Sequence, residues 1–110
     1  MDVLHYLTDE GVDPFQVWLE SLADSKAQYA VFQRVTRLAA GNAGDHCFCR
    51  GGIWELRIDT GPGYRVYFAR PVPDEVLLLH GGTKRTQRRD IMRAIERWTD
   101  FQRRVNRRRH

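Results

Sequence analysis

The sequence has very few cysteines, and this limits the kinds of site that it can form. Its 110 residues include two, Cys47 and Cys49, within the run HCFCRGG. Two residues apart is too close for an ordinary disulfide, and two thiols are too few for a structural zinc site. His46 adds a third candidate ligand, but a tetrahedral site still needs a fourth from elsewhere. We therefore expect reduced thiols in a loop, no metal and no cofactor.

Long hydrophobic runs are also missing. No stretch approaches the ~20 apolar residues that a membrane-spanning helix needs. The first residues, MDVLHYLTDEG, are acidic and lack the basic segment that opens a secretory signal. With 42% hydrophobic and 29% charged residues, the composition is that of a folded globular protein. The sequence thus predicts one domain over residues 1–110, cytoplasmic and without a membrane partner.

Positive charge is concentrated in the last part of the chain. Residues 1–83 hold 7 basic and 11 acidic side chains, whereas residues 84–110 hold 11 basic and 3 acidic ones. Of the 18 cations, 16 are arginines, whose planar and permanently charged guanidinium group suits phosphate. Such a block is typical of a surface for nucleic acid, another anionic surface or an acidic partner protein. A solubilising helix with a frayed basic tail over about 103–110 would give the same pattern.

The hydrophobic periodicity changes from helical to alternating along the chain, and it predicts a small α+β domain of order β-α-α-β-β-β-α. Asp13 followed by Pro14 is a strong helix start, and Gly41 is placed to end a second helix. The short connection between these helices predicts a helical hairpin, packed against a mostly antiparallel sheet. The expected elements are strands at 3–7, 52–59, 64–69 and 75–82, helices at 13–22 and 24–40, a loop at 41–52 and a basic last helix from Thr86.

Two arginines stand in the middle of strands, where β-branched and aromatic residues are more usual. Side chains alternate along a strand, so Arg57 shares a face with Glu55 and Asp59, and Arg65 shares a face with Tyr67. If the opposite face packs against the helical hairpin, Arg57, Arg65 and Tyr67 project together from the other face, partly exposed. In a purely structural alternative, Arg57 pairs with Glu55 or Asp59 and Arg65 pairs with a carboxylate from a helix.

The run GGTKRTQRR follows the last strand and adds positive charge. Its two glycines let the backbone turn closely. Lys84 and Arg85 then stand where a strand opens into a helix N-terminus, which is a place that favours an anion. Together with Arg57 and Arg65 they make four cations in one place. Such a group is unfavourable without an anion, because like charges raise each other's energy. The pattern therefore favours a phosphate site.

The histidines on strands and the tryptophans have structural interpretations. A lone histidine on a strand, such as His80 or His5, is more often a hydrogen-bonded structural residue than a catalyst. Trp18, Trp54 and Trp98 fall on apolar stripes, so we assign them to the core rather than to base stacking.

Two longer runs carry a family resemblance. GIWELRIDTGPGYRVYFA, followed by VLLLHGGTKRTQRRDI, resembles the RelE/ParE superfamily of type II toxins. Within it, these runs are most similar to the HigB-like branch, the phage-derived Gp49-like addiction-module killer proteins. DPFQVWLESL and the second predicted helix are similar to the N-terminal hairpin of that family. The resemblance implies a RelE-like fold for the domain.

The resemblance also implies a function. It implies a toxin that arrests growth and is neutralised in a hetero-oligomer by a cognate antitoxin, usually a small helix-turn-helix protein. Many such toxins are endoribonucleases (mRNA interferases) that bind the ribosome, cut messenger RNA and so inhibit translation. Their reaction needs no metal, because the ribose 2′-hydroxyl attacks the adjacent phosphate. Two alternatives stay open, namely a ParE-like inhibitor of DNA gyrase without nuclease activity and an inactive module that binds nucleic acid or antitoxin.

The same resemblance implies roles for individual residues. Arg57 falls where the RNase members have a basic strand residue near the scissile phosphate, and Arg65 matches the arginine that clamps that phosphate. Lys84 and Arg85 match the basic pair after the last strand. The expected catalytic residues are Arg57, Arg65, Lys84 and Tyr67, and the expected RNA-binding residues are Arg85, Arg88, Arg89 and Tyr64.

The final segment departs from the family pattern. Several RNase members have a catalytic tyrosine or histidine there, and TQRRDIMRAIERW has neither. Tyr67, Tyr64 or His46 would then substitute, or the basic groups alone would carry the proton transfer. Lys84 is one candidate base, whereas arginine stays protonated and is a poor proton shuttle.

Overall fold

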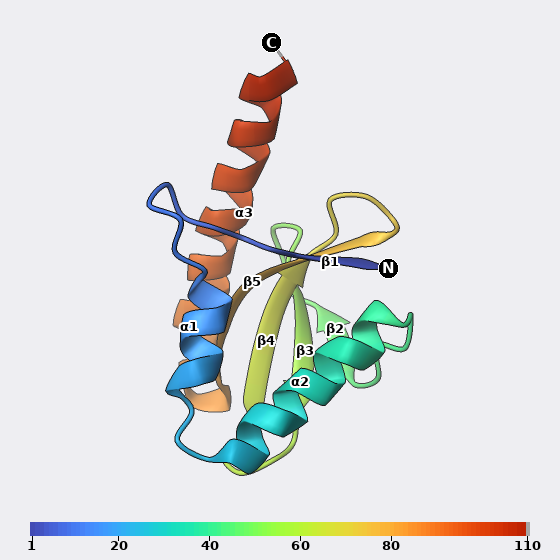
Figure 1. Cartoon of the computed structure of the whole chain (residues 1–110), viewed down its shortest axis with the longest axis vertical. Coiled ribbons are helices and arrows are strands. Elements are labelled where there is room, and N and C mark those ends of the chain that lie inside the picture. Colours follow the sequence, from blue (N-terminus) through green and yellow to red (C-terminus); the bar gives the residue numbers. More distant parts are fainter. Residues whose placement is uncertain (110) are drawn as a thin grey trace.

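The computed structural model describes residues 1–109 and has the expected α+β architecture. One five-stranded sheet is flanked by three α-helices (Figure 1). The strands are β1 (Asp2–His5), β2 (His46–Phe48), β3 (Trp54–Ile58), β4 (Tyr64–Ala69) and β5 (Glu75–Thr83). The helices are α1 (Pro14–Ser21), α2 (Ser25–Ala39) and α3 (Gln87–Arg109), the last preceded by a 3₁₀ turn, η1 (Lys84–Thr86).

The sheet is mixed but mostly antiparallel. Its strand order is β1-β5-β4-β3-β2. From β2 to β5 each strand pairs antiparallel with the next, whereas β1 pairs parallel with β5. β5 is thus an interior strand with both faces covered, as its continuous apolar run predicts.

The strand order contains one element that the sequence did not predict. His46–Phe48, within the segment expected to be a loop, pairs with β3 as strand β2. Arg34 of α2 holds this segment in place by donating to the carbonyl oxygens of Ala43, Asp45 and Arg57. Three paired residues carry too little periodicity to be recognised from sequence. The expectation of a loop over 41–52 is therefore wrong for these residues.

The helical hairpin begins as predicted. Asp13 caps α1 by accepting a hydrogen bond from the backbone N–H of Gln16, and Pro14 stands in the first turn. Asp24 caps α2 by accepting from the backbone N–H of Lys26. Both helices lie on one face of the sheet, α1 against β5 and α2 against β3.

The sheet separates two hydrophobic cores, because alternate residues of its strands point to opposite faces. The strand residues in the core under the helical hairpin are Leu56, Ile58, Tyr64, Val66, Phe68, Val76 and Leu78. The residues of the core under α3 are Tyr6, Ile53, Tyr67, Ala69, Leu77, Leu79 and Ala94. Both faces of the sheet are thus covered by helices.

The packing of α3 over one face of the sheet contradicts one expectation. We expected Arg57, Arg65 and Tyr67 to project together from an open face. Instead α3 packs over that face, and Arg65 is 7% exposed and Tyr67 0%. The side chain of Arg57 keeps 38% exposure. Strand parity correctly places the three side chains on one face, but it does not tell which face the last helix covers.

Gly81 and Gly82 lie inside β5 rather than in a turn. A Cβ atom on Gly81 would lie 2.0 Å from the ring of Trp18 on the hairpin face, and one on Gly82 would lie 1.9 Å from the carboxylate of Asp90 on the α3 face. The interpretation that these glycines let the backbone turn is therefore wrong. They allow α1 and α3 to approach β5 closely from its two sides.

The long helix α3 extends well beyond the sheet (Figure 1). The basic tail expected over about 103–110 is helical up to Arg109, and His110 lies outside the described residues. Arg104 anchors this part of the helix by donating to the carbonyl oxygen of Leu7 and pairing with Asp100. Across residues 1–109, no helix is both long enough and apolar enough to cross a bilayer.

Candidate functional site

Glu55 is the centre of a charged cluster on the α3 face of the sheet. It is fully buried, and a buried carboxylate needs charge compensation or hydrogen bonds. Arg57 Nε donates to Glu55 Oε2 at 2.9 Å, and Gln87 Nε2 donates to Oε1 at 2.6 Å. Arg65 Nε lies 3.6 Å from Oε1, which makes an ion pair but no hydrogen bond. One carboxylate therefore holds two arginines and ties β3 to the first turn of α3.

The alternative in which each arginine pairs with its own carboxylate holds only in part. Arg57 does pair with Glu55, but Arg65 uses the same carboxylate instead of one on a helix. The two arginines are direct cross-strand partners, and like charges in that arrangement repel. Asp45 approaches Arg57 only to 4.0 Å at the exposed rim, which is a weak contact. At distances shorter than 4.0 Å the two guanidinium groups therefore share the single carboxylate of Glu55, and a bound anion would relieve their repulsion.

Arg57 is the accessible member of this pair. Its hydrogen bond to Glu55 is the main cause that raises the pKa of Arg57 above its ordinary value, so the guanidinium group stays charged. Arg65 is buried behind it and donates to the carbonyl oxygen of Tyr64 at 3.0 Å. Within the described residues, the Nε atom of Arg65 has no hydrogen-bond partner.

Lys84 and Arg85 form the turn between β5 and α3, and both are exposed. The backbone N–H of Lys84 donates to the carbonyl oxygen of Gly63 at 2.8 Å. A Cβ atom on Gly63 would lie 3.6 Å from Lys84 Cβ and 3.7 Å from Arg65 Nη1. Lys84 and Arg65 therefore flank the same glycine of the GPG turn. This turn brings the first residue of η1 close to Arg65.

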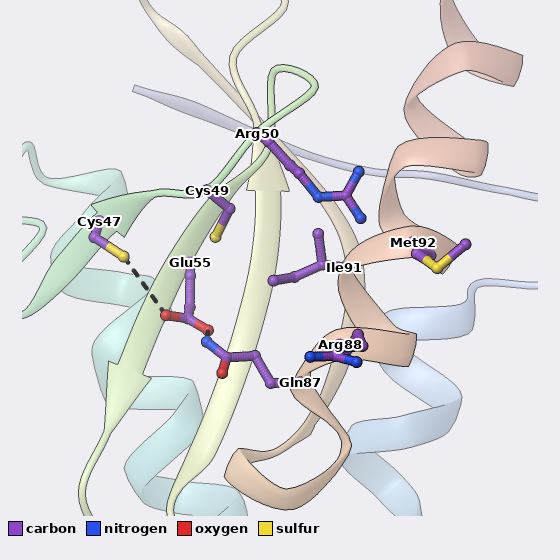
Figure 2. A pocket seen from close by; sticks show the side chains of 8 residues that line it. All are labelled: Cys47, Cys49, Arg50, Glu55, Gln87, Arg88, Ile91 and Met92. Atoms are coloured by element: carbon purple, nitrogen blue, oxygen red, sulfur yellow. Dashed lines mark hydrogen bonds between the residues drawn. The ribbon is translucent and has the colours of Figure 1, made fainter.

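A cleft of about 530 Å³ separates the β2–β3 edge from the first turns of α3 (Figure 2). Glu55 and Gln87 meet at its floor, Cys47 and Cys49 line it from the β2 side, and Arg88 lines it from α3. Burial, and after it the negative charge of Glu55, raises the pKa of Cys49 to about 12. This thiol is therefore protonated near neutral pH.

A second cleft, of about 540 Å³, adjoins the first along α3, because Arg88 and Met92 line both. The residues that line the second cleft are Arg85, Thr86, Arg88, Arg89, Met92, Arg93 and Glu96. Four arginines against one glutamate give this surface a strongly positive potential, which is typical of contacts to a phosphate backbone.

The two tyrosines expected at the site are buried. The hydroxyl of Tyr67 has no hydrogen-bond partner among the described residues. Burial, followed by the charges of Glu55 and Asp90, raises the pKa of Tyr67 well above its ordinary value. Tyr64 lies in the hairpin core with its ring against Trp18. In this structure neither tyrosine is available to a substrate in the clefts.

A second buried network fixes the start of α3 on β5. His80 Nε2 lies 2.9 Å from Asp90 Oδ1, and the hydroxyl of Thr86 donates to Asp90 Oδ2. Arg97 donates to the carbonyl oxygen of Leu79 and lies 2.5 Å from His80 Nδ1. Burial is the main cause that lowers the pKa of His80. This network positions the first turns of α3, which carry the cleft residues.

Sequence reasoning missed Glu55 and Gln87 as the residues that organise the cleft. Glu55 occupies an ordinary alternating position, and the only signal was that it shares a face with Arg57. Gln87 has no signal at all in TKRTQRR. His46, a candidate acid or base, has its ring against Trp54, and its Nδ1 lies 2.8 Å from the carbonyl oxygen of Gly44.

Comparison with known proteins shows the family. Residues 18–99 match the family model described as phage derived protein Gp49-like (DUF891). The chain is also similar to an uncharacterized protein of Haemophilus influenzae, with 45% identity over 80 residues that cover 73% of this chain and 81% of the relative. The chain therefore belongs to the Gp49-like family. This family is associated with the toxins of toxin–antitoxin modules, whose partners are cognate antitoxins.

Proposed function

We propose that the chain is the toxin of a type II toxin–antitoxin module, of the HigB-like branch of the RelE/ParE superfamily, and cuts messenger RNA on the ribosome. The observation that carries this proposal is the excess of positive charge around the cleft. Arg57 and Arg65 share one carboxylate, and exposed Lys84 flanks the same glycine as Arg65. The association of the Gp49-like family with such toxins supports the proposal.

The proposed reaction is metal-free cleavage of a phosphodiester. The ribose 2′-oxygen attacks the adjacent phosphorus and the 5′-oxygen leaves, which gives a 2′,3′-cyclic phosphate and a 5′-hydroxyl. The phosphorane that forms on the way carries extra negative charge, and guanidinium groups held in place beforehand stabilise it. Arg57 is the accessible group for this task, while buried Arg65 raises the positive potential from behind it.

Proton transfer requires a base for the 2′-hydroxyl and an acid for the leaving oxygen. The burial of Tyr67 and the orientation of His46 argue against both as partners in this step. Lys84 is exposed, flanks Gly63 together with Arg65 and carries an amine, so we assign it the role of base.

The RNA backbone is proposed to follow the second cleft. Arg85, Arg88 and Arg89 line it and would contact phosphates on either side of the scissile bond. The remaining basic side chains of α3 would contact ribosomal RNA. Such contacts release counterions, so we expect affinity to fall steeply as salt concentration rises. A small helix-turn-helix antitoxin would neutralise the toxin by covering these clefts with acidic side chains or an amphipathic helix.

Primer extension on cellular messenger RNA during induced expression tests the function. The proposal predicts growth arrest with new 5′ ends inside translated reading frames, in register with codons. The cuts should disappear when translation initiation is blocked. Intact messages together with broken chromosomal DNA would contradict the proposal and indicate a ParE-like gyrase inhibitor. Normal growth with intact messages and DNA would indicate a binding module without activity.

A further inference from the structure

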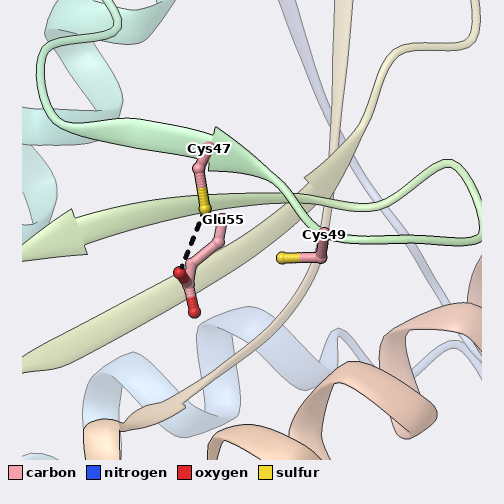
Figure 3. A group of neighbouring side chains, drawn as sticks. All are labelled: Cys47, Cys49 and Glu55. Carbon is pink, nitrogen blue, oxygen red and sulfur yellow. Dashed lines mark hydrogen bonds between the residues drawn. The ribbon is translucent and has the colours of Figure 1, made fainter.

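Cys47, Cys49 and Glu55 bring three metal-binding side chains together at the edge of the cleft (Figure 3). We propose that they form a binding site for a thiophilic metal ion, for which Zn²⁺ is the probe. The two sulfur atoms and a carboxylate oxygen all lie within 4.8 Å of one another. The proposal does not depend on the toxin function, because its test measures metal binding alone.

Strand pairing creates this arrangement. Cys47 is the direct cross-strand partner of Glu55, and the backbone N–H of Cys49 continues the pairing by donating to the carbonyl oxygen of Ile53 at 2.9 Å. Residues two apart in an extended segment share a face, so both thiols lie on the face of Glu55. His46, the third candidate ligand in the sequence, lies on the opposite face, and Glu55 takes its place.

The spacing of the ligand atoms fits a tetrahedral ion. Zinc binds sulfur at about 2.3 Å and carboxylate oxygen at about 2.1 Å, which at the tetrahedral angle separates the two ligand atoms by about 3.6 Å. Cys47 Sγ lies 3.6 Å from Glu55 Oε2. The sulfur of Cys49 points toward the same space (Figure 3). The fourth coordination position would face the cleft, where a water molecule or another small ligand fits.

The residues around these ligands already make the contacts that support metal sites. Gln87 donates to Glu55 Oε1 at 2.6 Å, and Arg57 Nε donates at 2.9 Å to Oε2, the oxygen that lies toward the thiols. Arg57 Nη2 lies 3.2 Å from Cys47 Sγ and donates to it. Hydrogen bonds from outer residues orient metal ligands and tune their affinity. The two oxygens of the Glu55 carboxylate thus have different hydrogen-bond donors, Gln87 and Arg57.

The charge of the cluster selects among metals. A bound zinc ion deprotonates its thiol ligands outright, so Zn²⁺ with two thiolates adds no net charge beside Arg57 and Arg65. A hard ion such as Mg²⁺ prefers oxygen ligands and would add its full charge next to the two arginines. We therefore expect Zn²⁺ to bind and Mg²⁺ not to compete.

Titration of the reduced, full-length protein with Zn²⁺ against a chromophoric chelator tests the site. We expect one ion per chain, unaffected by excess Mg²⁺, and a thiolate-to-metal charge-transfer band when Co²⁺ replaces Zn²⁺. Cys47→Ser and Cys49→Ser should each weaken Zn²⁺ binding by at least about 100-fold, more than the loss of an outer-shell partner typically costs. His46→Ala is the matched control and should bind Zn²⁺ as the unmodified protein does.

Glu55→Asp tests the third ligand while keeping the negative charge that the arginines need. It withdraws the carboxylate by about one carbon–carbon bond, or ~1.5 Å, and should weaken Zn²⁺ binding by about 10-fold or more. Circular dichroism of each variant checks that it is folded. The proposal is overturned if the unmodified protein binds no Zn²⁺, if the cysteine variants bind it unchanged, or if His46→Ala loses it as they do. Unchanged Zn²⁺ affinity in folded Glu55→Asp would remove Glu55 from the site.

Discussion

The two faces of the sheet are buried in different ways. Under the helical hairpin the core consists of apolar and aromatic residues. Under α3 lie the three buried charged residues found within residues 1–108, namely Glu55, Arg65 and Asp90. Burying a charge pair often stabilises a protein no more than well-packed apolar residues would. The α3 face therefore contains groups that stability alone does not require, and the clefts lie along it.

The largest expected effect contrasts two neighbouring residues on opposite faces. Glu55→Ala leaves buried Arg65 without its carboxylate and should lower the free energy of unfolding by about 3–5 kcal/mol. Leu56→Ala leaves a cavity under the helical hairpin and should cost about 2–5 kcal/mol. Urea unfolding measures both.

A second substitution distinguishes an unpaired buried charge from a cavity as the cause of the lost stability. Adding Arg65→Met to Glu55→Ala removes the unpaired buried charge and should recover part of the lost stability. In Leu56→Ala, Glu55 still pairs with Arg65, so the same addition removes no unpaired charge and should bring no recovery. A stability of Glu55→Ala within about 1 kcal/mol of the unmodified protein would refute the role assigned to the carboxylate.

The next effect concerns the adjacent glycines of β5. Gly81→Ala and Gly82→Ala each insert a methyl group where a ring or a carboxylate already lies. Overpacking of this kind should cost about 1–3 kcal/mol at either position. Gly82→Ala should in addition increase amide hydrogen exchange in the first turns of α3, because it displaces Asp90 from His80 and Thr86. Equal exchange in both variants would contradict the role of Asp90 as the anchor of α3.

The pH dependence of stability should also come from the α3 face. The pKa of His80 is lowered in the folded protein, so the unfolded chain takes up the proton first. The stabilisation is present above the unfolded pKa of about 6.5 and is lost as pH falls below it, at up to about 1.4 kcal/mol per pH unit. His80→Gln should flatten the curve between pH 6.5 and 5. Parallel curves for the two proteins would rule out this origin.

The smallest effect is expected where the later turns of α3 contact Tyr6. Tyr6 is buried there, and its hydroxyl donates to Asp100 at 2.6 Å. Burial, and after it this hydrogen bond, raises the pKa of Tyr6 to about 12. Tyr6→Phe removes one hydrogen bond and should cost about 1 kcal/mol in urea unfolding. A loss above 3 kcal/mol would show that the far end of α3 depends on this contact more than the structure indicates.

The sequence predicts the hairpin face better than the α3 face. Apolar periodicity and helix caps such as Asp13 and Asp24 are local signals, and they place α1 and α2 correctly. The α3 face depends on contacts between distant segments. Gln87 reaches Glu55 across 32 positions, and no local pattern reports this contact. For the same reason the sequence predicts the partial exposure of Arg57 but not the burial of Arg65 and Tyr67.

The growth of cells that express arginine and lysine variants tests the central claim most directly. Arg57→Ala, and separately Lys84→Ala combined with Arg85→Ala, should abolish growth arrest and messenger RNA cleavage while the proteins stay folded. Arg37→Ala, which removes an exposed arginine from α2, is the matched control and should arrest growth as the unmodified toxin does. Full toxicity in both variants would contradict the claim that the basic side chains beside Glu55 and in the η1 turn form the functional site.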